Sequence, residues 1–320
     1  MYGSQAARET NDFIVDTTGR AKQSVLVNYI APEHGWRRLL QCGTLEQWQT
    51  DVAAAGTVEP IVAFGISASL AAPLLPISSI DTCFVHFYGN VLDDRIDILD
   101  VVASVWGVPH RERPASIDVT IFLIHSRNGV PLVLDDLDFA MFGRGPRVAR
   151  MLVRSAGLAR ERCTADWWMR PTPRPMMITT GLKRFAEYLG DEIARTAPLC
   201  IDVSMAAATD ALDRVRVPAL ENTGHVGPLF RAALLQRDGW NRAQAAVERA
   251  RSSLGQVGPR GARAACATVA AAGELATELG LVPWRAGTAT AAAARVLAAW
   301  REARRRTPET GARRKLATRS

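Results

Sequence analysis

The sequence predicts an α/β protein in which a parallel sheet core is followed by a helical C-terminal region. Two observations lead to this prediction. Short apolar runs alternate with helical segments up to about residue 205, and Ala-rich helical segments dominate after it. Near-continuous apolar strands that alternate with helices are typical of a parallel sheet whose two faces are covered. The length of 320 residues allows one large domain or two modest ones.

Each element follows from a local pattern. A helix is expected to begin after Thr44, with Gln47 at the capping-box position, and a second helix is expected from about residue 60 to 75. Apolar runs predict strands at 83–88, 119–125, 130–136 and 173–181, with helices at 96–106 and 145–161 between them. Further helices are predicted at 226–236, 239–254, 260–280 and 287–306, separated by glycine and proline breakers. The expected organisation is an N-terminal segment 1–42, an α/β core 43–204, a helical region 205–306 and a basic flexible tail 307–320.

The positive charge of the chain is concentrated at its C-terminus. The whole sequence carries +7, and residues 301–320 hold eight Lys or Arg and two acids, which gives +6 and leaves +1 for the rest. Such a segment fits contacts with the phosphate backbone of DNA. The candidate residues are Arg304, Arg305, Arg306, Arg313, Arg314 and Lys315. The alternative is a solvated terminus that keeps the protein soluble.

The sequence carries no pattern of export or membrane insertion. The N-terminus lacks the apolar segment of a secretory signal, and the longest apolar candidate, residues 60–77, is interrupted by breakers and is typical of a buried helix. Five cysteines occur without a CxxC pair, which favours reduced thiols in a cytoplasm and argues against a structural zinc. We therefore expect a cytoplasmic protein with no metal and no membrane partner.

The segment HFYGNVLDDRID at 86–97 lies between a predicted strand and a predicted helix, the frame in which many proteins hold a phosphate. The motif for such a loop is G-x-x-x-x-G-K-[ST]. Gly89 fills its first position, whereas the other three defining positions hold Asp94, Arg95 and Ile96. Asp94 puts a carboxylate where the backbone should wrap the phosphates, and Ile96 has no oxygen for magnesium. By pattern alone this segment is not a P-loop.

A second acidic feature is the run VPLVLDDLD at 130–138. An apolar strand that ends in paired acids is typical of a Walker-B strand. In that reading Asp135 would support a metal through water, and Asp136 would polarise the attacking water. The alternative is a strand end whose acids face solvent or cap the next helix.

The acids after the two strands raise a further question. If both groups meet at the carboxyl edge of the sheet, they could bind a divalent ion, and the alternative is that Arg95 and nearby arginines neutralise them. The acids concerned are Asp93, Asp94, Asp97, Asp135 and Asp136. The five histidines show no ligand spacing, and His86 is expected in the core or at a strand edge.

Several segments together resemble the domain-of-unknown-function 927 family, helicase- and primase-associated P-loop proteins of phages and mobile elements. The matching segments are GTLEQWQTDVA (43–53), FGISASLAAPLL (64–75), HFYG (86–89), VVASVWG (101–107), LVLDDLDFA (132–140), ITTG (178–181) and the helical stretch 267–300. The resemblance implies a P-loop NTPase-like core of the RecA/AAA+ type. It implies that Gly89, Asp94, Arg95 and Ile96 occupy a degenerate Walker A loop. It also makes Thr179 and Thr180 sensor-like.

The resemblance implies a place in DNA replication or maintenance of a mobile element. Because the loop departs from the motif, we expect a protein without effective ATP hydrolysis that binds nucleic acid or docks onto a helicase or primase, with a homo-oligomer also compatible. One alternative is a weak or active ATPase or DNA helicase that uses Arg95 in place of lysine. ATP and magnesium are expected as cofactors only in that case. Another alternative is a decaying paralogue without a selected activity.

Overall fold

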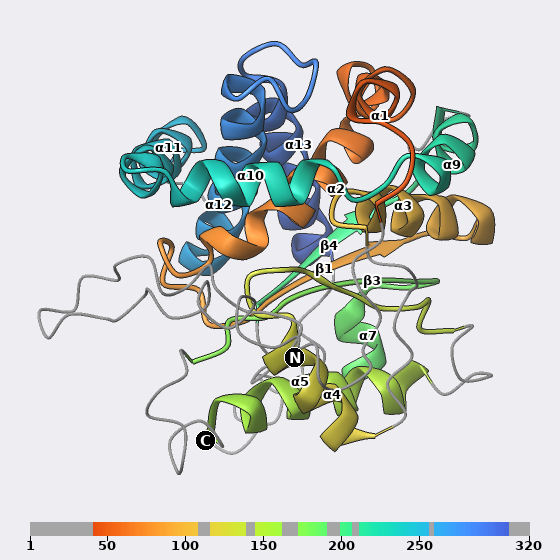
Figure 1. The fold of residues 1–320 in the computed structure, drawn as a ribbon. Helices are drawn as coiled ribbons and strands as arrows, with labels where there is room; N and C mark the ends of the chain where they lie inside the picture. The colour runs from red at the N-terminus through yellow and green to blue at the C-terminus, as the bar shows by residue number, and fades with distance from the viewer. Residues whose placement is uncertain are drawn as a thin grey trace, which may run out of the picture.

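A four-stranded parallel sheet lies between two layers of helices in the computed structural model (Figure 1). The structure describes residues 41–107, 116–138, 145–161, 172–190, 199–206, 211–255 and 259–306. The strands are β1 (Cys83–Tyr88), β2 (Leu132–Val133), β3 (Met176–Gly181) and β4 (Leu199–Ser204), and their order in the sheet is β2-β3-β1-β4. The predicted α/β class with a parallel sheet is therefore confirmed.

The sheet is buried on both faces because successive apolar residues of β1 point to opposite sides. Cys83, Val85 and Phe87 of the central strand β1 point into the larger core, while Phe84 points into the smaller core on the opposite face. In the register of the parallel ladder, His86 lies beside Thr179 of β3 and Asp202 of β4. These polar side chains are therefore brought together at the centre of the sheet.

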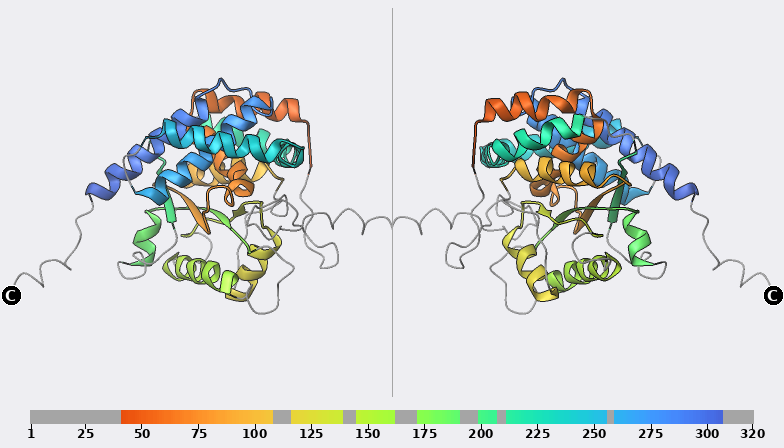
Figure 2. Two further views of the ribbon diagram at one scale, coloured as in Figure 1. Left: turned by 90° about the vertical axis from the view of Figure 1, so that its left-hand side faces the viewer. Right: turned by 90° about the vertical axis from the view of Figure 1, so that its right-hand side faces the viewer.

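In the described part of the chain, three helices cover the smaller core and form the lower layer in Figure 1. They are α4 (Ile117–Ser126), α5 (Gly145–Glu161) and α7 (Phe185–Leu189). The upper layer holds the remaining helices, and the two views of Figure 2 show that they cover the other face of the sheet. They are α1 (Leu45–Asp51), η3 (Ala53–Thr57), α2 (Pro60–Ala71), η4 (Ala72–Leu74), α3 (Leu92–Ser104), α9 (Ala211–Glu221), α10 (Val226–Leu235), α11 (Gly239–Ser253), α12 (Arg260–Glu278) and α13 (Thr288–Arg306).

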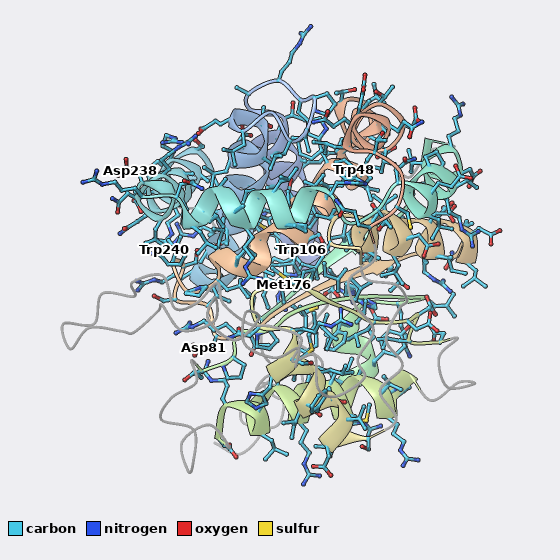
Figure 3. The ribbon with its side chains drawn as sticks, viewed as in Figure 1. Trp48, Asp81, Trp106, Met176, Asp238 and Trp240 are labelled. Carbon is cyan, nitrogen blue, oxygen red and sulfur yellow. The ribbon has the colours of Figure 1, made fainter. Side chains whose placement is uncertain are left out.

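Helix α2 is the centre of the upper layer. Eleven of its twelve residues are buried, which fits a segment without a single charge. It packs closely against α12. A Cβ added to Gly273 of α12 would lie 2.3 Å from the Ser67 hydroxyl of α2, so the two helices need a glycine at this contact. Trp48 and Trp106 are almost fully buried in the same layer (Figure 3), and their indole N–H groups donate to the Ser104 hydroxyl and the Ser69 carbonyl. One continuous core therefore includes residues on both sides of position 205.

The prediction of a strand at 119–125 is wrong, because this segment lies in helix α4. The Ser116 side chain accepts a hydrogen bond from the Val119 N–H at 3.3 Å and so caps the helix. The buried positions are Thr120, Ile121, Leu123 and Ile124, which is helical spacing, while Phe122 between them is exposed. A β-branched apolar run of this length is compatible with a strand or with a helix. The Ser116 cap favours the helix.

Two other boundaries differ from the prediction, and one further strand is observed. The strand expected at 130–136 is only two residues long in β2, and helix α3 begins at Leu92 rather than at residue 96. Strand β4 is absent from the prediction, although LCIDVS alternates apolar and polar residues as a half-buried strand does. The predicted helices at 60–75, 145–161 and 226–306 are confirmed with shifts of a few residues at their ends.

No helix in the described ranges is long and apolar enough to cross a membrane. The cysteines in these ranges are all free: Cys42, Cys83, Cys200 and Cys266. Cys163 lies outside the described residues.

Candidate functional site at the carboxyl edge of the sheet

The connection between β1 and α3 is short. It contains only residues 89–91, because α3 begins at Leu92. Gly89 donates its N–H to the Gly181 carbonyl at 3.1 Å, and a Cβ at this position would lie 2.9 Å from the Cβ of Met205. The close approach of the chain after β4 therefore accounts for the glycine. No phosphate is needed to explain it.

The first turn of α3 provides its own negative charges. Asp93 and Asp94 lie in this turn, where the partial positive charge of a helix N-terminus favours anions. In phosphate-binding loops a phosphate takes that place. The helix end of this chain therefore has carboxylates of its own at the position where a nucleotide would be bound.

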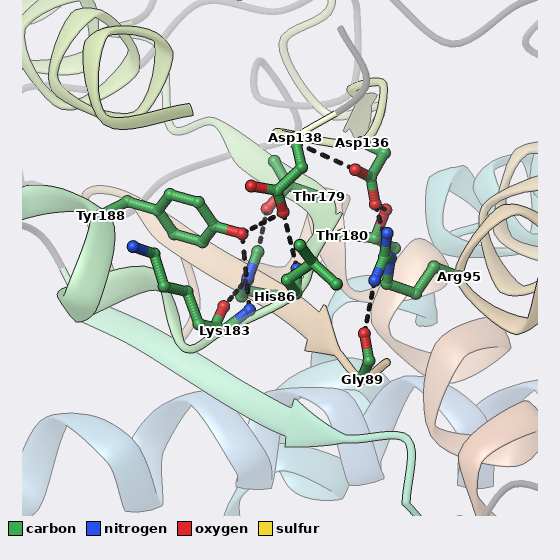
Figure 4. Close-up of polar contacts among 10 residues, drawn as sticks. His86, Gly89, Arg95, Asp136, Asp138, Thr179, Thr180, Lys183 and Tyr188 are labelled. Atoms are coloured by element: carbon green, nitrogen blue, oxygen red, sulfur yellow. Dashed lines mark hydrogen bonds and ion pairs between the residues drawn. The ribbon is translucent and has the colours of Figure 1, made fainter. Parts of the chain in front are cut away.

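Arg95 and Asp136 form a buried ion pair next to this helix end (Figure 4). The distance from Arg95 Nε to Asp136 Oδ2 is 2.8 Å, and the two residues are 3% and 0% exposed. Arg95 Nη1 also donates to the Gly89 carbonyl. Asp136 accepts further hydrogen bonds from the Thr180 hydroxyl at 2.8 Å and from the Asp138 N–H at 3.0 Å. Both oxygens of the Asp136 carboxylate are thus engaged within the protein.

This pair joins the two segments that the sequence analysis compared with the Walker A and Walker B motifs. Arg95 stands at the lysine position of the phosphate motif, and Asp136 is the second acid of the Walker-B-like run. In the structure the guanidinium neutralises the carboxylate instead of reaching outward. Asp135 is buried beside them, and Ile96 is half-buried. The arrangement can hold the loops after β1 and β2 together, and it leaves neither charge of the pair uncompensated.

A second polar network lies on the other face of β3. Thr179, one of the two sensor-like residues, is hydrogen-bonded to His86 Nδ1 at 2.6 Å, while Thr180 contacts Asp136 on the opposite side. His86 Nε2 contacts the Lys183 carbonyl at 2.8 Å. Burial lowers the pKa of His86 to about 4, so the imidazole is neutral at neutral pH and donates one hydrogen bond. The two threonines therefore serve two separate networks.

Asp138 and Tyr188 complete this second network and were not among the predicted site residues. The Tyr188 hydroxyl donates to Asp138, and Asp138 Oδ2 accepts the Leu182 N–H at 2.7 Å (Figure 4). Asp138 also contacts Asp136 through its N–H, so the two networks share the chain after β2. A sequence signal for Asp138 was present in the run LDDLD. Tyr188 had no local signal, because its role depends on where α7 packs.

The acids do not form a cation site in the described part of the chain, where no group of three or more potential ligands is close enough to hold a metal ion. Arg95 pairs with Asp136, and Arg216 Nε lies 3.2 Å from Asp97 and from Asp100. Of the five acids considered in the sequence, Asp136 and Asp97 are therefore paired with an arginine.

The predicted nucleic-acid residues are only partly within the described ranges. Arg304 and Arg305 lie exposed near the end of α13, and the Arg304 guanidinium lies 4.9 Å from the ring centre of Trp300. Arg306 is the last residue of that helix. Arg313, Arg314 and Lys315 lie outside the described residues.

The parallel sheet between two layers of helices, with a strand–loop–helix at its carboxyl edge, is a three-layer α/β fold, and this fold fits a P-loop-like core. Residues 8–165 match the family described as "Domain of unknown function (DUF927)", which supports the resemblance drawn from the sequence. A solved structure described as "SCCmec type IV Cch - active helicase" is similar, with a TM-score of 0.55 and 17% identity over 83% of this chain. The similar region spans 50% of that chain, and the likeness is one of fold. No curated protein matches the sequence.

The carboxylate of Asp202 gives the site a testable pH dependence. It accepts the Phe185 N–H at 2.8 Å, and burial raises its pKa from 3.8 to about 6. The folded protein thus holds this proton more tightly than the unfolded chain, so the associated stability is full below pH 4 and is lost as the pH rises to about 6. His86, whose pKa is lowered to about 4, acts in the opposite direction between pH 4 and 6.5.

Asp202→Asn keeps an acceptor for the Phe185 N–H and removes the titration. The variant should therefore gain stability relative to the wild type as the pH rises from 4 to 7.5, by about 1–2 kcal/mol. Urea unfolding at both pH values measures the change. Asp51→Asn at an exposed position of α1 is the matched control for the loss of one negative charge. An Asp202→Asn effect that is the same at both pH values would contradict the assignment.

Proposed function

We propose that this protein acts in the DNA replication or maintenance of a mobile element as a nucleic-acid-binding or helicase-docking module, without effective ATP hydrolysis. The buried ion pair between Arg95 and Asp136 is the observation that carries the proposal. A triphosphate with magnesium needs a cation that reaches its terminal phosphates and an acid that serves the metal. Here these two positions compensate each other.

Two further features support the loss of nucleotide binding. The short connection 89–91 has too few residues to wrap its N–H groups around a phosphate, and Asp93 and Asp94 would repel one. The helicase-like fold and the family resemblance support the replication context. A helicase or primase partner and a homo-oligomer are parts of the proposal that follow from the family resemblance. Cytoplasmic location is a further part, and it rests on the cysteine pattern and on the N-terminus.

Calorimetry with ATP and magnesium tests the central claim. We expect no saturable heat up to about 1 mM nucleotide, because binding would first have to break the Arg95–Asp136 pair. Micromolar binding together with phosphate release would favour the alternative of an ATPase that uses Arg95 in place of lysine. The Asp51→Asn variant, altered far from the carboxyl edge, serves as the folded control for the heat of dilution.

The basic tail is proposed to supply nucleic-acid affinity. Residues 301–320 hold most of the net charge, so binding of single-stranded DNA should be independent of sequence. The logarithm of the association constant should fall with the logarithm of the salt concentration, with a slope of about −0.7 per contacted phosphate. A chain that ends after residue 306 keeps α13 complete and should lose the part of the affinity that residues 307–320 supply. Equal affinity of the two chains at moderate salt would show that residues 307–320 supply none of the contacts.

A further inference from the structure

Helix α5 presents arginine along its solvent side. Arg147, Arg150 and Arg154 are all exposed and are spaced three and four residues apart, which puts them on one side of the helix. Figures 1 and 2 show α5 on the outer side of the lower layer, away from the upper helices. The opposite side of α5, with Val148 and Leu152, is buried in the smaller core. The orientation of the arginines is therefore fixed by the fold.

The stability of the helix does not require these arginines. The first turn of α5 contains no acid, and the partial positive charge of a helix N-terminus disfavours a cation such as Arg147 at this end. Arg150 Nε donates to the Pro146 carbonyl at 2.9 Å, and neither Arg147 nor Arg154 pairs with a carboxylate among the described residues. Three like charges on one side of a helix repel each other, which also lowers its stability.

Three arginines of helix α11 behave differently. On α11, Arg242 and Arg249 contact Glu278, and Arg251 contacts Glu248. These three arginines are thus matched by acids, as is common on a solvated face. On the α5 face the positive charge extends from residue 147 to residue 154 without an interposed acid. The difference indicates that this face is complementary to an external anion.

We propose that the exposed side of α5 binds the phosphate backbone of nucleic acid, at a site separate from the C-terminal tail. The planar guanidinium group binds phosphate oxygens with two hydrogen bonds, a geometry that lysine cannot supply. From residue 147 to 154 the helix axis extends about 10 Å, which corresponds to about three phosphates of one strand. Such contacts involve no base edges and are independent of sequence.

A membrane surface fits the same helix less well. A helix that lies in the interface of a bilayer inserts its apolar side among the lipids. The apolar side of α5 is covered by the sheet and by α4, so only its charged side is accessible. The proposal therefore commits to nucleic acid, and vesicles of anionic lipid provide the comparison.

The test measures binding of a fluorescent single-stranded oligonucleotide of mixed sequence to the full chain by anisotropy. The variant Arg147→Gln/Arg150→Gln/Arg154→Gln should bind about tenfold more weakly at about 50 mM salt. Its salt slope should be shallower by about 2, which is three contacts at about 0.7 each. The matched control replaces Arg242, Arg249 and Arg251 by Gln, which removes the same charge from the opposite layer and should change affinity less than about threefold.

A second variant separates charge from fold. Arg147→Lys/Arg150→Lys/Arg154→Lys keeps the charges and should retain most of the salt slope, with the same thermal unfolding curve as the wild type. An unchanged affinity of the α5 Gln variant would overturn the proposal. An equal loss in the α5 and α11 variants would overturn it too, because net charge alone would then explain binding. So would a loss of binding to phosphatidylserine vesicles without a loss of binding to the oligonucleotide.

This test does not depend on the tail or on ATP. If the tail proposal fails, the chain that ends after residue 306 binds as well as the full chain, and the α5 variant still loses its share. If the α5 proposal fails, only the truncated chain loses affinity. The two failures are therefore distinguishable.

Discussion

Replacing Arg95 by methionine is expected to lower the free energy of unfolding by about 3–5 kcal/mol, because it leaves the Asp136 carboxylate buried without its counter-charge. The Thr180 hydroxyl and the Asp138 N–H still donate to Asp136, but neither carries a positive charge. Urea unfolding at neutral pH, analysed with a common slope, measures the loss. A change below about 1 kcal/mol would show that water or a rearranged donor replaces the guanidinium at little cost.

Two variants define the origin of this loss. Arg249→Met removes the same side chain from an exposed pair with Glu278 and should cost less than about 1 kcal/mol. Arg95→Met combined with Asp136→Asn should be more stable than Arg95→Met alone, because the amide oxygen still accepts from Thr180 and needs no counter-charge. The double-mutant cycle then gives the coupling between the two side chains directly. Absence of coupling would assign the loss to packing of the arginine stem.

A chain that ends after residue 206 is expected to show no cooperative unfolding transition. Without α9–α13, helix α2 loses the α12 and α13 surfaces against which it packs. Its eleven buried residues, which are all apolar or small, would then be exposed in part. Exposing a helix that is apolar on all sides removes a large share of the hydrophobic stabilisation of the upper layer. The predicted boundary near residue 205 would then separate two segments of one folding unit.

Circular dichroism during urea unfolding, with the chain that ends after residue 306 as the control, tests this expectation. The control keeps every described helix and should unfold in a single transition with a slope in proportion to its buried surface. A sharp transition of similar slope per residue for the shorter chain would contradict the single core. It would support the division into an α/β domain and a separate helical domain.

The parts of the fold that the sequence made predictable are those with strong local patterns. The capping residue Thr44 and the apolar run of β1 give elements within a residue or two of those observed. The strand predicted at 119–125 failed because Ser116, which lies outside the apolar run, caps the segment as a helix. Strand β4 depends on partners far away in the sequence. It pairs with β1, and its Asp202 carboxylate accepts a hydrogen bond from the Phe185 N–H at the start of α7.

The candidate site was predictable in its residues but not in its contacts. Arg95 and Asp136 were each singled out by their position relative to a strand, and the neutralisation of the acids by Arg95 was weighed as an alternative. The pairing itself depends on the strand order, which places β3 between the two loops and brings Thr180 to the same carboxylate. The network of His86, Asp138 and Tyr188 was beyond local patterns, because it needs α7 in place.

The buried pair across β3 also limits the order in which substitutions can accumulate. Replacing Arg95 first leaves the Asp136 carboxylate buried without the guanidinium that pairs with it, and replacing Asp136 first leaves the guanidinium buried without the carboxylate. Each single substitution therefore lowers the free energy of unfolding by several kcal/mol, out of a total of about 5–15 kcal/mol. A lineage can therefore move between this loop and a phosphate-binding one, in either direction, only through an unstable intermediate or after stabilising changes elsewhere. The ion pair is therefore a barrier to evolutionary change of this loop in both directions.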